Sequence, residues 1–165
     1  MINWIKKIFS PPKKESQNKD FDNIIIGKIT ELKEHSNADK LQLVVTDIGQ
    51  PEPVQIVCGG TNLKEGMFVV VGLPGAKVKW HGEGEPVVLE EAKIRGEKSF
   101  GMICASNEIG IEDKFPCGEM EITDLSNISN LKVGKSLTLV TLVQTVKLAW
   151  SVPSLQPRVP FSNPY

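Results

Sequence analysis

The stretch that decides the fold is Leu41-Gln-Leu-Val-Val-Thr-Asp-Ile48, followed by Gly49-Gln-Pro-Glu-Pro53 and Val54-Gln-Ile-Val-Cys58. The first and last pieces are short and rich in β-branched residues, which is typical of strands. The middle piece holds a glycine and two prolines, which favour a turn and interrupt strand pairing. The sequence therefore predicts two consecutive strands joined by a turn.

More short apolar runs occur on both sides of this pair, and turn residues separate them about every ten positions. Strands are expected at 23–34 (bent at Gly27), 67–71, 77–80, 87–89, 92–95 and 99–105. Single helical turns are expected at 62–65, where Asn62 and Glu65 fit a capping box, and at 106–109. Long helical periodicity is absent, so the pattern predicts an all-β fold, a small barrel, with a sandwich as the alternative.

The composition limits the class of protein. The chain has 165 residues, of which 40% are hydrophobic and 24% charged, with 19 basic and 20 acidic residues. These values are ordinary for one globular domain with tails, and they argue against wholesale disorder. A net charge of −1 excludes a protein that grips nucleic acid by bulk charge alone, although a local basic patch stays possible.

Catalytic, metal and membrane signals are weak. The three cysteines, Cys58, Cys104 and Cys117, are an odd number without CxxC spacing, so we expect no disulfide framework, no metal site and a reducing, cytoplasmic location. Gly134-Lys135-Ser136 lacks the glycine that a phosphate loop places upstream. The N-terminus has no signal-peptide core, and 137–150 is too short and too polar to span a bilayer.

Composition also divides the chain along its length. We expect an N-terminal arm and linker at 1–22, the barrel domain at 23–116, a strand-rich extension at 117–143 and a proline-rich tail at 144–165.

Several separated motifs follow one another in a distinctive order. They are His35-Ser-Asn-Ala-Asp-Lys-Leu41, Thr46-Asp-Ile-Gly49, Gln55-Ile-Val-Cys-Gly59, Asn62, Glu65-Gly-Met67, Lys93-Ile-Arg-Gly96, Ser99-Phe-Gly-Met-Ile-Cys104 and Glu108-Ile-Gly110. This order, over residues 24–112, resembles the EMAPII-like family of OB-fold tRNA-binding domains. It is most similar to the form at the N-terminal end of the bacterial phenylalanyl-tRNA synthetase β subunit.

The resemblance implies a small five-stranded OB barrel with short helical turns and terminal extensions. It implies a tRNA-binding module without catalysis of its own and without a cofactor. The partners that it implies are tRNA and, in some contexts, synthetase subunits, whereas nothing in the sequence supports a homodimer. Two alternatives stay open: a truncated β subunit of the synthetase, and a peptide-binding, chaperone-like relative of the same fold.

The candidate tRNA-binding residues are those on the loops and outer face of such a barrel that can contact phosphate, ribose or base. They are Lys40, Asn62, Lys77, Lys79, Lys93, Arg95, Lys98 and Ser99. Arg95 is the strongest candidate because its planar guanidinium can bind phosphate bidentately, and strand alternation would place it beside Lys93. The alternative is that Arg95 pairs with Glu90, Glu91 or Glu97 and only holds the hairpin.

A second group of residues is expected to shape the loops of the barrel. They are His35, Asn37, Asp39, Gly59, Gly96 and Gly101. The chain also departs from the family pattern, with Ser36 in place of a proline and Gly60-Thr61 in place of Ala-Pro. Its loop from His81 to Pro86 is longer and more acidic than expected, which argues against nucleic-acid contact at that loop.

Overall fold

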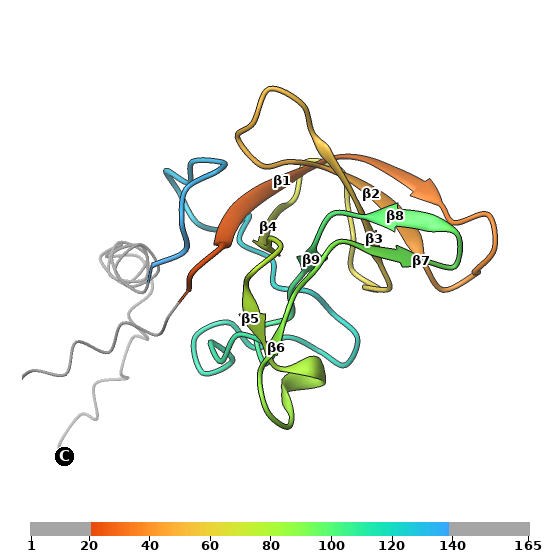
Figure 1. The fold of residues 1–165 in the computed structure, drawn as a ribbon. Coiled ribbons are helices and arrows are strands. Elements are labelled where there is room, and N and C mark those ends of the chain that lie inside the picture. Colours follow the sequence, from red (N-terminus) through yellow and green to blue (C-terminus); the bar gives the residue numbers. More distant parts are fainter. Residues whose placement is uncertain (1–20, 139–165) are drawn as a thin grey trace, which may run out of the picture.

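A computed structural model describes residues 21–138 and shows an all-β protein (Figure 1). Five strands form one antiparallel sheet in the order β3-β2-β1-β4-β9. Their bounds are β1 (Ile24–Glu34), β2 (Gln42–Asp47), β3 (Val54–Cys58), β4 (Phe68–Gly72) and β9 (Met102–Ile103). The sheet curls into a nearly closed barrel, which confirms the predicted all-β, OB-like fold with a five-stranded core.

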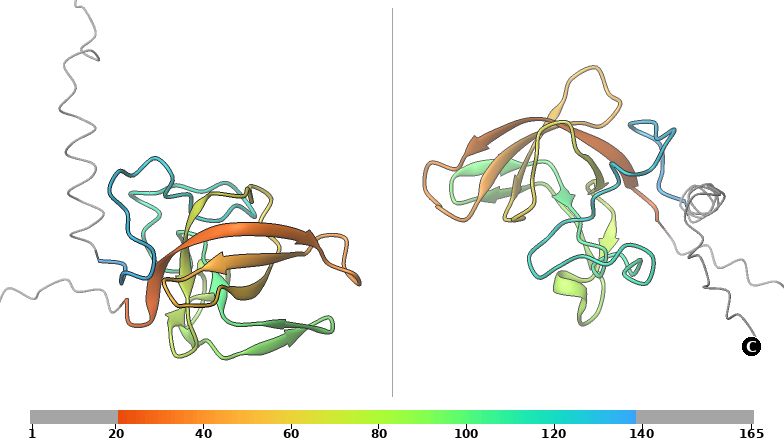
Figure 2. Two further views of the ribbon diagram at one scale, coloured as in Figure 1. Left: turned by 90° about the horizontal axis from the view of Figure 1, so that it is seen from above. Right: turned by 180° about the vertical axis from the view of Figure 1, so that it is seen from behind.

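Two small hairpins extend this barrel. One joins β5 (Lys77–Val78) to β6 (Val87–Val88) through the 3-10 turn η2 (Trp80–Gly82). The other joins β7 (Ala92–Ile94) to β8 (Glu97–Ser99). The three views in Figures 1 and 2 show the two hairpins projecting in different directions from the barrel.

Hydrogen bonds from β3 to the last residue of β8 and to the residue after it close most of the remaining gap. The Phe100 N–H donates to the Gln55 carbonyl at 2.9 Å, and the Val57 N–H donates to the Ser99 hydroxyl at 3.0 Å. The edge of β3 is thereby covered, which removes much of the unpaired backbone that an open sheet would present.

The core lies on both sides of the sheet, and β4 shows why its sequence is continuously apolar. Val70 packs into a cluster with Ile24 and Ile26, whereas Val69 and Val71 pack into a second cluster on the opposite side. All three valines are fully buried. A strand covered on both faces needs apolar residues at every position instead of at every second one.

The chain after residue 116 covers part of this core. Leu125 and Leu137 are fully buried and belong to the same cluster as Ile24. The Leu137 N–H donates to the Ile24 carbonyl at 2.9 Å, so the segment also pairs with β1. Figure 2 shows this blue part of the chain lying against the start of β1. Residues 1–20 of the predicted arm at 1–22, the last five residues of the predicted extension at 117–143 and the whole predicted tail at 144–165 lie outside the described residues.

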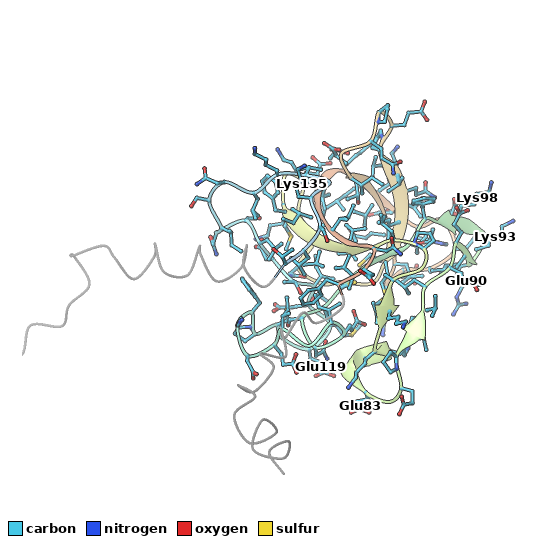
Figure 3. All side chains as sticks on the ribbon, turned by 60° about the vertical axis from the view of Figure 1, so that its left-hand side comes forward. Glu83, Glu90, Lys93, Lys98, Glu119 and Lys135 are labelled. Carbon is cyan, nitrogen blue, oxygen red and sulfur yellow. The ribbon has the colours of Figure 1, made fainter. Side chains whose placement is uncertain are left out.

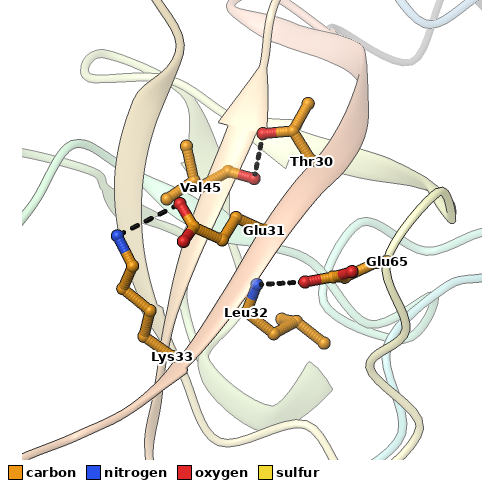
Figure 4. A network of polar contacts seen from close by, with 6 residues as sticks. All are labelled: Thr30, Glu31, Leu32, Lys33, Val45 and Glu65. Carbon is orange, nitrogen blue, oxygen red and sulfur yellow. Dashed lines mark hydrogen bonds and ion pairs between the residues drawn. The ribbon is translucent and has the colours of Figure 1, made fainter.

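The pairing of β1 with β2 shifts register between Ile29 and Glu31, which marks a β-bulge in β1. Beyond the bulge, β4 no longer pairs with β1, and the carboxylate of Glu65 accepts the Leu32 N–H at 3.2 Å (Figure 4). Glu65 therefore caps a free strand edge. The predicted capping box with Asn62 is wrong, because 62–65 forms turns without a helix, as does 106–109.

Candidate nucleic-acid interface

The β7–β8 hairpin carries three exposed basic side chains, Lys93, Arg95 and Lys98, which we name the hairpin patch. Lys93 and Lys98 lie opposite each other in the pairing register. Arg95 and Gly96 form the turn, with φ of 52° and 104°. Positive φ at both central residues is required by the type I′ turn, a common two-residue connection in β-hairpins. The predicted alternation is therefore wrong at Arg95, which lies at the tip of the hairpin instead of beside Lys93 on a strand face.

The patch is not neutralised by its acidic neighbours. Within residues 21–138, one ion pair forms, between Lys33 and Glu31 at 3.1 Å. None joins Arg95 to the nearby carboxylates that the sequence offers as structural partners. Arg95, Lys93 and Lys98 are thus exposed and form no ion pair within the described residues. Figure 3 shows Lys93 and Lys98 extending from one side of the barrel.

Two predicted loop-shaping residues, His35 and Asn37, fix the hairpin turn. His35 is buried, and its Nδ1 accepts the Asn37 N–H at 3.0 Å. The other ring nitrogen, Nε2, therefore carries the proton and donates to the Ile94 carbonyl at 3.1 Å. The Asn37 amide donates to the Arg95 carbonyl at 3.4 Å. The loop of residues 35–41 is thereby attached to the end of β7 at Ile94 and to the turn residue Arg95.

The same loop presents further charged side chains. Lys40 and Asp39 are both exposed on it. Asp39 makes no side-chain hydrogen bond within the described part of the chain, so the predicted shaping of the loop rests on His35 and Asn37. Gly59 packs against this loop, since a Cβ there would lie 3.3 Å from the Leu41 side chain.

An open groove of about 400 Å³ runs between β3 and the hairpin patch. Its walls carry Val54, Gln55, Glu91, Ala92, Lys93, Lys98, Ser99 and Phe100. The Gln55 amide donates to the Lys98 carbonyl at 2.9 Å, which joins the hairpin to β3. Nothing in the sequence pattern singled out Gln55 for this role, because its partner is 43 positions away.

Ser99 and Asn62, two predicted tRNA contacts, have their polar groups engaged within the protein. The buried Ser99 hydroxyl accepts from the Val57 N–H and donates to the Gly101 carbonyl at 3.0 Å. The Asn62 amide donates to the Ile122 carbonyl at 3.0 Å and accepts the Ile122 N–H at 2.9 Å. These bonds hold the barrel closed and anchor the segment around residue 122.

Lys77 and Lys79 are exposed on the other hairpin, β5–β6, away from the hairpin patch. They border a groove of about 300 Å³ that Glu108 and Asn107 also line. Burial raises the pKa of the Glu108 carboxyl, although its hydrogen bond from the Ala105 N–H at 2.8 Å opposes this shift. Burial also raises the pKa of the Cys58 and Cys104 thiols, so both stay protonated near neutral pH.

Gly101 permits the closest backbone approach near the interface. Its φ is 117°, and a Cβ there would lie 2.4 Å from the Gly72 carbonyl oxygen. Only glycine fits this position without displacing β4, so the path of the backbone between β8 and β9 requires glycine here.

The described residues contain no group of three or more His, Cys, Asp or Glu side chains that could hold a metal ion. Among the same residues, no helix has the length and apolar character needed to cross a bilayer.

Comparison with known proteins finds a matching family model and similar curated proteins. A family model described as "Putative tRNA binding domain" matches residues 24–127. The phenylalanine–tRNA ligase beta subunit of Chlorobaculum tepidum is 48% identical over 90 residues, which cover 54% of this chain and 11% of that protein. The same subunit of Chlorobium chlorochromatii is 38% identical over 112 residues, covering 68% of this chain and 13% of that protein.

Among solved structures, the C-terminal domain of Plasmodium vivax p43 aligns with a TM-score of 0.48 at 24% identity. The alignment covers 69% of this chain and 58% of that chain. Relative to the two ligase beta subunits, the chain spans about an eighth of their length.

Proposed function

The chain belongs to the tRNA-binding domain family, and from that premise we propose that it binds tRNA through the hairpin patch and the adjoining loop of residues 35–41. The resemblance found in the sequence is confirmed by the family match. Lys93, Arg95 and Lys98 provide the phosphate contacts, and Lys40 adds a further one from the loop.

The observation that carries this proposal is the state of the three basic side chains. They are exposed, they form no ion pair within residues 21–138, and their hairpin is fixed by His35, Asn37 and Gln55. A rigid support reduces the entropy lost when such side chains bind a ligand. Contacts of this kind give affinity and position on RNA, whereas bases are recognised mainly where they are unstacked.

We also propose that Lys77 and Lys79, which lie away from the hairpin patch, contact tRNA phosphates. Asn62 and Ser99 contribute indirectly, because their bonds to Ile122, Val57 and Gly101 hold the barrel that presents the patch. We assign the chain no catalysis of its own. Its relatives are subunits of a tRNA ligase, so we propose that this module supplies tRNA binding in the cytoplasm, beside or within a synthetase.

A filter-binding titration tests the proposal. Purified protein is titrated against labelled bulk tRNA and, separately, against an unfolded polypeptide of similar length. We expect saturable tRNA binding that weakens steeply with salt and no comparable binding of the polypeptide. Binding of the polypeptide but not of tRNA would contradict the proposal and support a chaperone-like role.

A further inference from the structure

Trp80 stands out because its large aromatic side chain is exposed. It lies in η2, at the end of the β5–β6 hairpin, with 58% of its surface open to solvent. Tryptophan is usually well buried, because its ring system carries much apolar surface. An indole held in solvent on an ordered turn is therefore a feature that calls for a ligand or a partner.

The backbone around Trp80 is held on three sides. The Lys79 N–H donates to the Glu108 carbonyl at 2.8 Å, and the Glu83 N–H donates to the Trp80 carbonyl at 3.1 Å. The Asn107 amide donates to the His81 carbonyl at 3.1 Å. The bonds to Glu108 and from Asn107 attach the turn to the segment 105–110, and the bond between Glu83 and Trp80 closes the turn, so the indole projects from a fixed support.

The ring next to Trp80 leaves room for stacking. The His81 ring lies 5.3 Å from the indole, centroid to centroid, and the two planes meet at 76°. Because the rings are nearly perpendicular, the imidazole does not stack in parallel on the indole. A flat aromatic ligand can do so, and every nucleobase offers such a face.

Two cations lie directly before Trp80 in the chain. Lys77 in β5 and Lys79, the extended residue directly after it, are exposed, whereas Val78 between them is buried, so the two lysines lie on the same outer face. Both border the 300 Å³ groove, which the acidic residues Glu108 and Glu112 also line. An aromatic platform beside a pair of cations is the arrangement by which proteins bind single-stranded nucleic acid.

We propose that Trp80 stacks on an unpaired base of the bound RNA while Lys77 and Lys79 contact the flanking phosphates. This inference rests on the proposed function and adds a second contact, on a hairpin different from the one that carries Arg95. The sequence argued against RNA at the loop after Trp80 because of its acidic residues. In the structure, Glu83 lies at the end of the β5–β6 hairpin that is farthest from the barrel (Figure 3).

Glu83 and Glu85 are both exposed, and their charges oppose phosphate. They therefore disfavour phosphate at the loop after Trp80, and the phosphate contacts of this hairpin are left to Lys77 and Lys79. The exposed Val87 and Val88 on β6 offer the other explanation of the exposed indole, which is an apolar contact with a protein. The basic pair beside the ring and the family of the chain favour RNA, and the two occupants give different results in the test below.

The test uses tryptophan fluorescence of the full chain. The chain has three tryptophans, Trp4, Trp80 and Trp150, so Trp4→Phe with Trp150→Phe leaves Trp80 as the only reporter. This variant is titrated with bulk tRNA and with an oligouridylate, and the same samples are measured by filter binding. We expect saturable quenching with the same midpoint as filter binding for both probes, because stacking quenches the indole.

Substitutions then separate stacking from apolar contact. Trp80→Ala should weaken oligouridylate binding about 5- to 100-fold, and Trp80→Phe should retain most of the affinity. Val88→Ala is the matched control, since it removes an exposed apolar side chain from the same hairpin without removing a ring. It should leave the affinity unchanged, and thermal melting checks that each variant folds. Glu83→Gln with Glu85→Gln should tighten binding.

Three results would overturn the inference. One is unchanged fluorescence while filter binding of tRNA is intact, which would leave the proposed function standing. Another is a fall in oligouridylate affinity for Val88→Ala that equals the fall for Trp80→Ala, which would indicate a general apolar contact. The third is the absence of binding by either method, which would remove the proposed function and this inference together.

Discussion

The imidazole Nε2 of His35 lies 3.1 Å from the carbonyl oxygen of Ile94, 59 positions further along the chain. This bond joins the loop before β2 to the hairpin that carries Arg95. Since Nδ1 of the same ring accepts the Asn37 N–H, one buried side chain orients both the loop and the hairpin. The position of the basic side chains is thus set by a residue that does not itself need to contact RNA.

His35→Ala should therefore loosen the hairpin. It removes both ring hydrogen bonds and leaves a small cavity, which should lower the free energy of unfolding by about 1–3 kcal/mol. Hydrogen exchange of the amides at 92–99 should speed up, and tRNA affinity should fall. Asn37→Ala is the matched control, because it removes only a 3.4 Å contact and should have a smaller effect. Unchanged exchange in the hairpin would show that His35 does not hold it.

Binding of tRNA should depend strongly on salt. With three to five phosphate contacts, the slope of log K against log salt should be roughly −2 to −5. Lys93→Ala or Lys98→Ala should each make this slope shallower by about 0.7 to 0.9 and should weaken different tRNAs equally. The measurement is filter binding at four or more salt concentrations. A slope that either variant leaves intact would place that lysine outside the interface.

Gly101→Ala should disrupt the closure of the barrel. A Cβ would collide with the Gly72 carbonyl oxygen at 2.4 Å, and the φ of 117° is unfavourable for alanine. We expect a loss of about 3 kcal/mol or more in urea unfolding. Gly66→Ala tests the backbone effect alone, because its φ is 83° and no atom lies within 4 Å of its Cβ. It should cost about 1–2 kcal/mol. Equal losses would contradict the role of the collision.

The stability should respond to pH through Glu108. Burial raises the pKa of its carboxyl above the ordinary value of 4.5, so the fold favours the protonated form. Protonated Glu108 therefore contributes to the free energy of unfolding. This contribution is complete below the pKa of the carboxyl in the unfolded chain, and it is lost as pH rises through the pKa in the folded protein. Glu108→Gln keeps an oxygen for the Ala105 N–H but does not titrate. Urea unfolding should therefore show the glutamine variant gaining stability relative to wild type between pH 4 and pH 7. A constant difference would contradict this.

The strands could be predicted because their signals are local. The alternation and β-branched residues of 42–47 and 54–58 are enough to indicate β2 and β3, and glycine and proline mark the turn between them. The end of the hairpin strand at Ile94 was harder to place. Arg95 begins the turn because Gly96 follows it, and Arg-Gly is a weaker turn signal than Asn-Gly.

The site could be predicted in part. The basic residues of the hairpin are visible in the sequence. That they form no ion pair with the rest of the described chain is not visible, because Glu90, Glu91 and Glu97 lie equally near in the sequence. The hydrogen bonds that the side chains of Asn62 and Ser99 make within the protein could not be predicted either. Their partners, Ile122 and Val57, are 60 and 42 positions away, and a single sequence does not indicate such pairings.

Arg95 allows the sharpest test of the proposed tRNA contact, because its charge and its backbone conformation can be separated. Its φ of 52° lies in the left-handed region that asparagine tolerates well, and Asn-Gly is the most favoured pair for this kind of turn. Arg95→Asn should therefore preserve or raise the melting temperature while removing the guanidinium.

We expect Arg95→Asn to weaken tRNA binding by about 1–3 kcal/mol, because a charge-assisted and often bidentate phosphate contact is lost. Arg95→Lys should recover only part of the affinity, since an ammonium group lacks the planar fork. Glu97→Gln, on the same hairpin, is the control of opposite sign and should strengthen binding slightly by removing a repulsive charge. The measurement is filter binding over a salt series with thermal melting alongside. If Arg95→Asn keeps both the affinity and the salt slope of the wild type, the hairpin tip does not contact tRNA.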